Sequence, residues 1–311
     1  MTKVTDMIDM ASALREQKVD ENLINMALEF RDSYTVEEPY LNRLVQPANI
    51  FYGKDVWEMA IAAILKGNNI LLSGPKATGK NVLADNLACL FGRPEYNISF
   101  NVTTDSSNLI GTDTFTDNEV RLRKGPVYQC AECGGFGIFD EVNMAKNDAV
   151  SVLHSALDHR RIIDVPGYEK IFLHDAARFI GTMNAGYAGT KELNEALVSR
   201  FLVIDMPRLD HDTVVKILRD NFPKAKPLAV EQFAGLFLDL QLKSLNSEIS
   251  TKAVDLRGMI AAMRTIEIGL SPQKAIRMGI TYKSFDVFER DIINDVILTR
   301  IPADWTPADI F

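Results

Sequence analysis

Between residues 46 and 207, short apolar runs alternate with stretches in which apolar residues recur at helical spacing. The runs have the length of buried strands and lie at residues 69–73, 96–102, 137–140, 178–183 and 201–206. The clearest helical stretches are residues 55–65, which end before Gly67, and a stripe formed by Val82, Leu83, Leu87 and Leu90. This alternation predicts a doubly wound α/β domain, with a mostly parallel sheet and helices on both faces.

The segments on either side of this domain show helical periodicity only. Residues 1–45 contain one stripe with Met7, Ile8, Met10, Ala11 and Leu14, and a second helix at 23–30 that Asp20 can cap. After Pro207, helical stripes occupy residues 212–221, 230–242, 251–266, 273–280 and 285–297. We therefore expect a helical N-terminal extension (1–45), an α/β core (46–207) and a small all-α domain (208–311) that acts as a lid on a ligand cleft.

Two stretches inside the α/β domain interrupt its rhythm. Residues 112–123 alternate around Asp117-Asn118, which predicts a small hairpin. Residues 161–173 form two short runs joined at Pro166-Gly167, a pair suited to a type II turn. Both are expected to be hairpins that project from the core.

The strongest chemical signal follows the run at 69–73. There a glycine-rich loop leads into a helix, and its candidate phosphate-binding residues are Gly74, Pro75, Lys76, Ala77, Thr78, Gly79, Lys80, Asn81 and Val82. Glycines let several backbone N–H groups point at one phosphate, the helix start adds a positive dipole, and Lys80 adds a charge. The spacing predicts a nucleoside triphosphate site; a simple glycine turn between strand and helix is the alternative.

Magnesium chemistry has two candidate ligands. Asn81 stands where such loops usually place a Ser or Thr hydroxyl, and its amide oxygen can ligate more loosely. Asp140 follows an apolar strand and is expected beside the phosphate loop, as is Glu141, a candidate general base for an attacking water. Alternatively, this acidic pair stabilises the start of a helix at 145–157.

Three further polar residues complete the candidate site. Asn184 ends the run at 178–183 and can bind the same water or the terminal phosphate, or else it only forms a turn before Ala185-Gly186. Arg200 ends the segment 193–200 and is either a finger for a neighbouring subunit's nucleotide or a cation on a helix dipole. Lys252 is expected at the start of the helix 251–266, capped by Ser250, where its ammonium can reach the cleft. If Lys252 does not reach the cleft, Arg257 is the next candidate for this role.

Composition narrows the function classes. The chain has 311 residues, 24% charged and 47% hydrophobic, which suits a soluble globular protein of about two domains. A formal net charge of −8 argues against general adhesion to nucleic acid or anionic membrane. No apolar run reaches membrane-spanning length and no signal arrangement begins the chain, so we expect a cytoplasmic location. Cys130 and Cys133 form a single CxxC, interpreted as two positions on one helix face.

These motifs together resemble an AAA+ ATPase and are most similar to the MoxR type. The resemblance spans residues 45–279 and rests on GPKATGKN, GIFDEVNMA, FIGTMNAGY and LNEALVSRF. It implies the following roles: Walker A lysine for Lys80, Walker B pair for Asp140 and Glu141, sensor 1 for Asn184, arginine finger for Arg200 and sensor 2 for Lys252. The two hairpins match the helix-2 and pre-sensor 1 insertions of that clade.

The resemblance further implies a function. It predicts an ATP hydrolase with Mg²⁺ that forms a ring, expected to be a hexamer, and remodels or activates a client protein, often one with a von Willebrand factor A domain. One alternative is a nucleotide-dependent assembly module that hydrolyses slowly or not at all, which Asn81 favours. Another is a nucleic-acid-associated AAA+ motor or GTPase, which the acidic charge disfavours.

Overall fold

The computed structural model describes residues 9–116, 118–165, 167–184 and 193–311. The chain divides into two compact units, one containing Gly79–Met206 with the residues up to Pro75, the other containing Pro207–Phe311 with Lys76–Thr78. Each unit has a hydrophobic core of its own.

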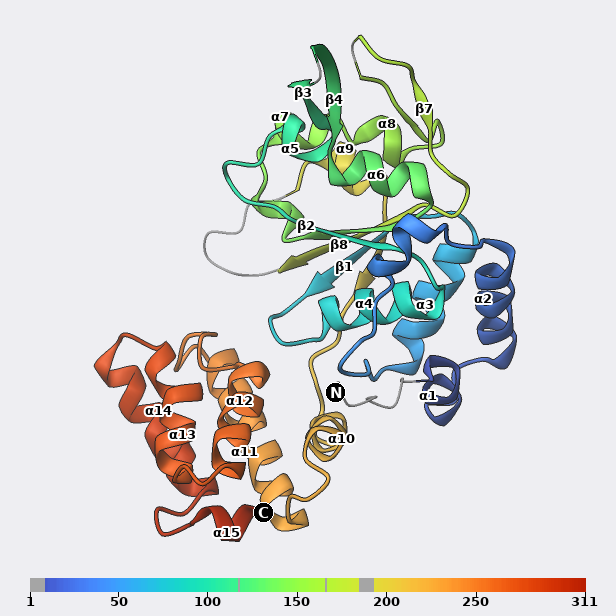
Figure 1. Cartoon of the computed structure of the whole chain (residues 1–311). Coiled ribbons are helices and arrows are strands. Elements are labelled where there is room, and N and C mark those ends of the chain that lie inside the picture. The colour runs from blue at the N-terminus through green and yellow to red at the C-terminus, as the bar shows by residue number, and fades with distance from the viewer. Residues whose placement is uncertain (1–8, 117, 166, 185–192) are drawn as a thin grey trace. The chain divides into compact units, whose positions relative to one another are not determined.

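A five-stranded parallel sheet forms the centre of the first unit (Figure 1). Its strands are β1 (Ile70–Gly74), β2 (Glu95–Ser99), β5 (Phe136–Asp140), β8 (Arg178–Asn184) and β9 (Leu202–Asp205), in the order β2-β5-β8-β1-β9. All four pairings are parallel, which confirms the predicted α/β class. The strand predicted at 96–102 ends early because the Asn101 side chain accepts a hydrogen bond from the Thr103 amide at 2.8 Å and starts a turn.

Helices cover both faces of this sheet (Figure 1). One face carries α1 (Met10–Glu16), α2 (Glu21–Ser33), α3 (Lys54–Leu65) and α4 (Lys80–Leu90). The other carries α5 (Ser106–Leu109), α6 (Pro126–Cys133), α7 (Asn147–Ser151), α8 (His154–Leu157) and α9 (Glu195–Val198). Successive β1 residues supply the two cores in turn, since Ile70 and Leu72 face the first set of helices and Leu71 the second.

Both predicted hairpins are present. The first pairs β3 (Gly111–Thr116) with β4 (Glu119–Lys124), and the second pairs β6 (Ile162–Ile163) with β7 (Ile171–Phe172). The Tyr168 hydroxyl of the second donates a hydrogen bond to Asp113 of the first at 2.7 Å, so the hairpins lie side by side. Asp117 and Pro166, named in the two predicted turns, lie outside the described residues.

The single helix predicted at 145–157 is wrong. A short 3-10 turn, η2 (Val142–Met144), is followed by the two separate helices α7 and α8. Each buries its own apolar residues, Ala149 and Val150 in α7 and Ala156 and Leu157 in α8. Burial against the sheet therefore does not require a continuous helix.

The second unit is helical. It consists of α10 (His211–Asn221), α11 (Pro227–Leu245), α12 (Leu256–Glu267), α13 (Pro272–Gly279), η3 (Thr281–Lys283), α14 (Val287–Arg300) and α15 (Pro307–Ile310). The 3-10 helix η1 (Glu38–Arg43) belongs to the first unit. Helices α12 and α13 meet at two glycines: a Cβ on Gly258 would lie 2.1 Å from the carbonyl oxygen of Gly279. None of the described helices is both long and apolar enough to span a bilayer.

The predicted start of the third helix in this unit is wrong. Helix α12 begins at Leu256 rather than at 251, and its N-cap is Asp255, whose carboxylate accepts a hydrogen bond from the Gly258 amide at 3.2 Å. Ser250 does not cap it. Residues 251–253 form a turn in which Ala253 is completely buried, so tertiary packing sets the boundary there.

Candidate active site

The predicted phosphate-binding residues occupy the turn between β1 and α4 and the first turn of α4. The turn is tight: a Cβ on Gly74 would lie 2.8 Å from the carbonyl oxygen of Met206, and the φ of Gly74 is 155°. Ala77 and Gly79 also have positive φ, at 60° and 84°. Positive φ angles are typical of loops that present several N–H groups to one anion.

The N-terminus of α4 faces this cradle. The helix has 11 residues, and its N-cap Gly79 provides no side chain to bond the first amides. These amides and the helix dipole favour an anion at this end. Lys80 is 8% exposed and its ammonium donates to the carbonyl oxygens of Gly74 at 3.0 Å and Pro75 at 2.7 Å, which holds a positive charge inside the loop.

The predicted acidic pair lies two strands away, at the end of β5. Asp140 Oδ1 accepts a hydrogen bond from the Thr182 hydroxyl at 2.7 Å, and the same hydroxyl accepts one from the Glu141 amide at 3.2 Å. Thr182 is 1% exposed on β8, between β5 and β1. The sequence motifs did not point to this residue. Its signal was the position two residues before Asn184, which places both side chains on the same face of the strand.

Glu141 and Asn184 are brought together. The Asn184 amide donates to Glu141 Oε1 at 3.2 Å, and Glu141 adopts a left-handed backbone conformation with φ 53°. Such a conformation is rare outside glycine and clusters at functional sites. Gly74 pairs with Asn184 in the sheet, so polar groups from three neighbouring strands meet at one edge. Ala185 and Gly186, part of the alternative turn, lie outside the described residues.

The donor set suits magnesium bound together with a nucleotide. Asn81 stands in the first turn of α4 and Asp140 at the end of β5, and both offer oxygen. No group of three or more acidic, His or Cys side chains among the described residues could hold a metal ion alone. Mg²⁺ bound to nucleotides takes one or two protein oxygens and completes its shell with phosphate and water, so this pair fits.

Arg200 lies at the opposite edge of the sheet. It follows α9 and precedes Leu202, which pairs with Ile70 at the amino end of β1, whereas the phosphate loop follows the carboxyl end. The four residue steps of β1 separate these edges by about 13 Å. Arg200 comes two residues after the end of α9 at Val198, and its side chain is 23% exposed.

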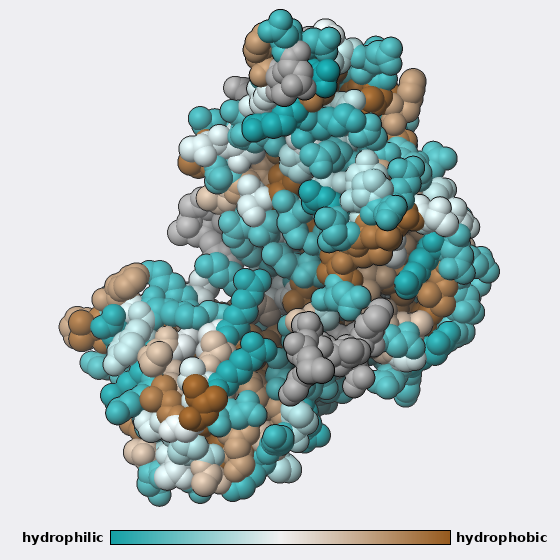
Figure 2. Space-filling view, in the orientation of Figure 1, coloured by the Kyte–Doolittle hydropathy of each residue, from teal (hydrophilic) through white to brown (hydrophobic). Residues whose placement is uncertain are grey.

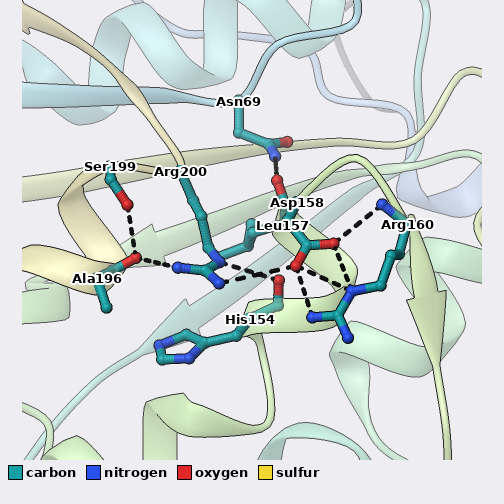
Figure 3. Close-up of polar contacts among 8 residues, drawn as sticks. All are labelled: Asn69, His154, Leu157, Asp158, Arg160, Ala196, Ser199 and Arg200. Atoms are coloured by element: carbon teal, nitrogen blue, oxygen red, sulfur yellow. Dashed lines mark hydrogen bonds and ion pairs between the residues drawn. The ribbon is translucent and has the colours of Figure 1, made fainter.

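Several contacts hold the Arg200 guanidinium in place (Figure 3). Its Nε donates to the His154 carbonyl at 3.1 Å, Nη1 donates to the Ala196 carbonyl, and Nη2 lies 3.7 Å from Asp158 Oδ2. Burial and the charge of Arg200 lower the pKa of His154. At neutral pH that imidazole is uncharged and adds no repulsion.

Lys252 lies on the second unit, away from any helix. It is exposed in the turn before α12, so the predicted placement at the start of a helix is wrong. Its ammonium lies 5.4 Å from the centre of the Phe285 ring, a cation–π contact. Hydrophobic surface gathers here around the start of α14, which Figure 2 shows in brown at the left of this unit. Arg257 is exposed on α12.

The CxxC pair is structural. Both cysteines lie on α6 as free thiols, and Cys130 is completely buried. Burial raises the pKa of both thiols, which disfavours the reactive thiolate.

Comparison with known proteins places the chain among ATPases of the AAA family. Residues 69–201 match the AAA domain of the dynein-related subfamily. The uncharacterized protein YojN of Bacillus subtilis (strain 168) is 30% identical over 245 residues, covering 77% of this chain and 80% of YojN. The uncharacterized protein SH1500 of Staphylococcus haemolyticus is 30% identical over 250 residues, covering 78% of this chain and 95% of the relative.

A solved structure is also similar. It is a candidate ATPase from Cytophaga hutchinsonii, 17% identical with a TM-score of 0.45, and the match covers 94% of this chain and 96% of that one. A likeness of this degree adds nothing to the family relationship, which rests on the domain match and the two relatives. With its glycine loop, acidic strand end and five-stranded sheet, the chain belongs to the AAA+ family of ATPases and carries the dynein-related type of AAA domain.

Proposed function

We propose that this protein binds ATP with Mg²⁺ and hydrolyses it as an AAA+ ATPase of the MoxR type. The observation that carries the proposal is the Asn184–Glu141 hydrogen bond of 3.2 Å at the sheet edge that also bears the phosphate loop. A carboxylate oriented there by a neutral amide is placed to act as general base for an attacking water. A phosphate cradle alone would serve binding, whereas this pair serves hydrolysis.

Each residue then has a defined task. The loop amides and Lys80 hold the phosphates, and Asn81 and Asp140 supply oxygens to Mg²⁺, which neutralises charge on the transferred phosphoryl group. Glu141 accepts a proton from the water whose oxygen bonds to the terminal phosphorus, while Asn184 orients Glu141 and that water. The bond from this phosphorus to the bridging oxygen breaks, and ADP leaves with the electron pair.

We further propose that the protein acts as a ring, expected to be a hexamer. Arg200 lies about 13 Å from the edge that bears its own loop, so it is suited to a neighbour's nucleotide. In this proposal residues 208–311 form the lid, and Lys252 is the residue of the lid that senses the nucleotide. The ring remodels or activates a client protein, including one with a von Willebrand factor A domain.

A second candidate is a nucleotide-dependent assembly module with very slow turnover. The observation that favours it is Asn81, because an amide oxygen is a weaker ligand for Mg²⁺ than the usual hydroxyl arrangement supplies. Steady-state ATP turnover separates the two candidates.

Mixed rings test the leading proposal. Arg200→Ala subunits retain Glu141, Glu141→Gln subunits retain Arg200, and each variant alone should lose most turnover, by about 10³-fold or more for Arg200→Ala. Mixing them should restore part of it, because a Glu141 site then meets Arg200 from its neighbour. Lys80→Ala is the control for the loop and should weaken ATP binding itself. Confirmed mixed rings without any recovery would falsify the role of Arg200 in trans.

A further inference from the structure

The carboxylate of Asp158 is shared between two arginines (Figure 3). Arg160 donates to it four times: the backbone amide to Oδ1 at 2.9 Å, Nε to both oxygens at 3.1 Å, and Nη2 to Oδ2 at 2.6 Å. Arg200 Nη2 lies 3.7 Å from the same Oδ2. The hydrogen bonds from Arg160 lower the pKa of Asp158 to about 2, so this carboxylate is ionised at neutral pH.

The two arginines belong to different parts of the α/β unit. Arg160 lies at the root of the second hairpin, two residues before β6. This root is fixed to the hairpin's return strand, since Leu173 donates its amide to the Arg161 carbonyl at 2.9 Å. Arg200 instead lies between α9 and β9. Asp158 is therefore the point at which the hairpin root and Arg200 meet.

The contact with Arg200 is the weaker of the two. At 3.7 Å it exceeds hydrogen-bond length, and the other acceptors of Arg200 are the neutral carbonyls of His154 and Ala196. The Asp158 side chain is 13% exposed, a setting in which an unpaired charge is costly. Because Arg160 remains bound, Asp158 can release Arg200 without becoming an unpaired carboxylate.

We infer that Asp158 is a positioning residue that holds Arg200 back and connects its release to the 162–172 hairpin. The inference rests on the proposed action of Arg200 on a neighbouring subunit's nucleotide. When the hairpin root moves, Arg160 and Asp158 move with it, and the restraint on the Arg200 guanidinium changes. Contact of a client with the hairpin thereby alters turnover in the adjacent subunit.

Two substitutions at this network should act in opposite directions. Asp158→Asn keeps the shape and an acceptor for the Arg160 amide but removes the charge, so kcat for ATP should rise about two- to fivefold. Arg160→Gln leaves Arg200 as the remaining cation on Asp158. Asp158 should then hold Arg200 more tightly, so kcat should fall. KM should stay within about twofold in both, because the phosphate loop lies at the other sheet edge. Asp164→Asn, which removes the exposed ion pair with Lys170 at 3.0 Å, is the matched control.

The decisive experiment places Asp158→Asn on one kind of subunit in the mixed rings. On the Glu141→Gln subunit, which supplies Arg200, it should raise the recovered turnover. On the Arg200→Ala subunit it should have no effect. A residue that merely stabilises the hairpin root would act equally from both positions, and unfolding temperatures of each variant identify general damage.

The outcomes are distinct. Equal effects from both subunits, or changes of the same sign for Asp158→Asn and Arg160→Gln, would overturn the positioning role while leaving the trans action of Arg200 intact. Mixed rings that recover no turnover even with native Asp158 would overturn the trans action, and the positioning role with it.

Discussion

The carboxylate of Glu95 is buried at the start of β2. Glu95 is 8% exposed and its Oε2 has no hydrogen-bond partner among the described residues, while Asn97 donates to Oε1. Burial first, and the nearby charge of Asp85 second, raise the pKa of Glu95 from 4.5 to about 7. The folded protein thus binds a proton that the unfolded chain releases near pH 4.5.

This shift predicts a pH dependence of stability. Since the pKa is raised in the folded state, the contribution is fully present below pH 4.5 and is lost as the pH rises to about 7, by up to about 3 kcal/mol. Glu95→Gln should therefore be more stable than the parent at pH 8 and nearly equal to it at pH 4.5, measured as urea midpoints. The exposed Glu119→Gln serves as the control. An unchanged difference between the two pH values would contradict the assignment.

Asn81 carries a second prediction at the residue scale. It stands in the first turn of α4, where a hydroxyl is the usual magnesium ligand. Asn81→Thr should lower the Mg²⁺ concentration required for half-maximal ATP turnover, with Asn81→Ala raising it. Magnesium titrations that coincide for the parent and both variants would show that Asn81 is not a ligand.

At the scale of elements, the start of α12 depends on Asp255. Its carboxylate accepts from the Gly258 amide at 3.2 Å and also pairs with Lys283, which ties α12 to η3. Asp255→Ala should lower the free energy of unfolding by about 1 to 2 kcal/mol, the usual cost of a lost N-cap. Asp255→Asn should lower the free energy of unfolding by less than Asp255→Ala, because the Asn side chain can still cap the helix. Ser250→Ala should have the smallest effect of the three. Thermal unfolding followed by circular dichroism measures all three variants. Equal destabilisation by all three would show that Asp255 is not the N-cap of α12.

Elements with strong periodicity were correctly predicted, and weaker ones were not. The strands β1, β5, β8 and β9 and the helix α3 match their predicted ranges to within about one residue. The prediction of one helix at 145–157 is wrong because two separate short helices bury its apolar residues. The prediction that α12 starts at 251 is wrong because a buried turn at Ala253 interrupts a continuous apolar pattern. Tertiary burial overrode local spacing in both places.

At the scale of the whole molecule, the chain forms two units with separate cores. The helices α1 and α2 share the core of the α/β unit, with Leu14, Ile24 and Ala27 buried against α3 and α4. The helical unit buries its own set of residues, among them Phe233, Phe237 and Met263. The sequence pattern predicted a change to a purely helical layer after Pro207, because each kind of periodicity requires its own kind of layer to cover its apolar face.

The sequence by itself predicted which polar groups the candidate site contains. Loop spacing predicted Lys80 as a phosphate ligand. Short apolar runs ending in polar residues made Asp140, Glu141 and Asn184 candidates, because the carboxyl ends of parallel strands share one sheet edge. Only the tertiary structure decided which groups meet: Thr182 joins Asp140 to Glu141, and Asp158 holds Arg200 at the opposite edge. These contacts join residues about 40 positions apart. Local spacing does not encode such distances, since strand order and register set them.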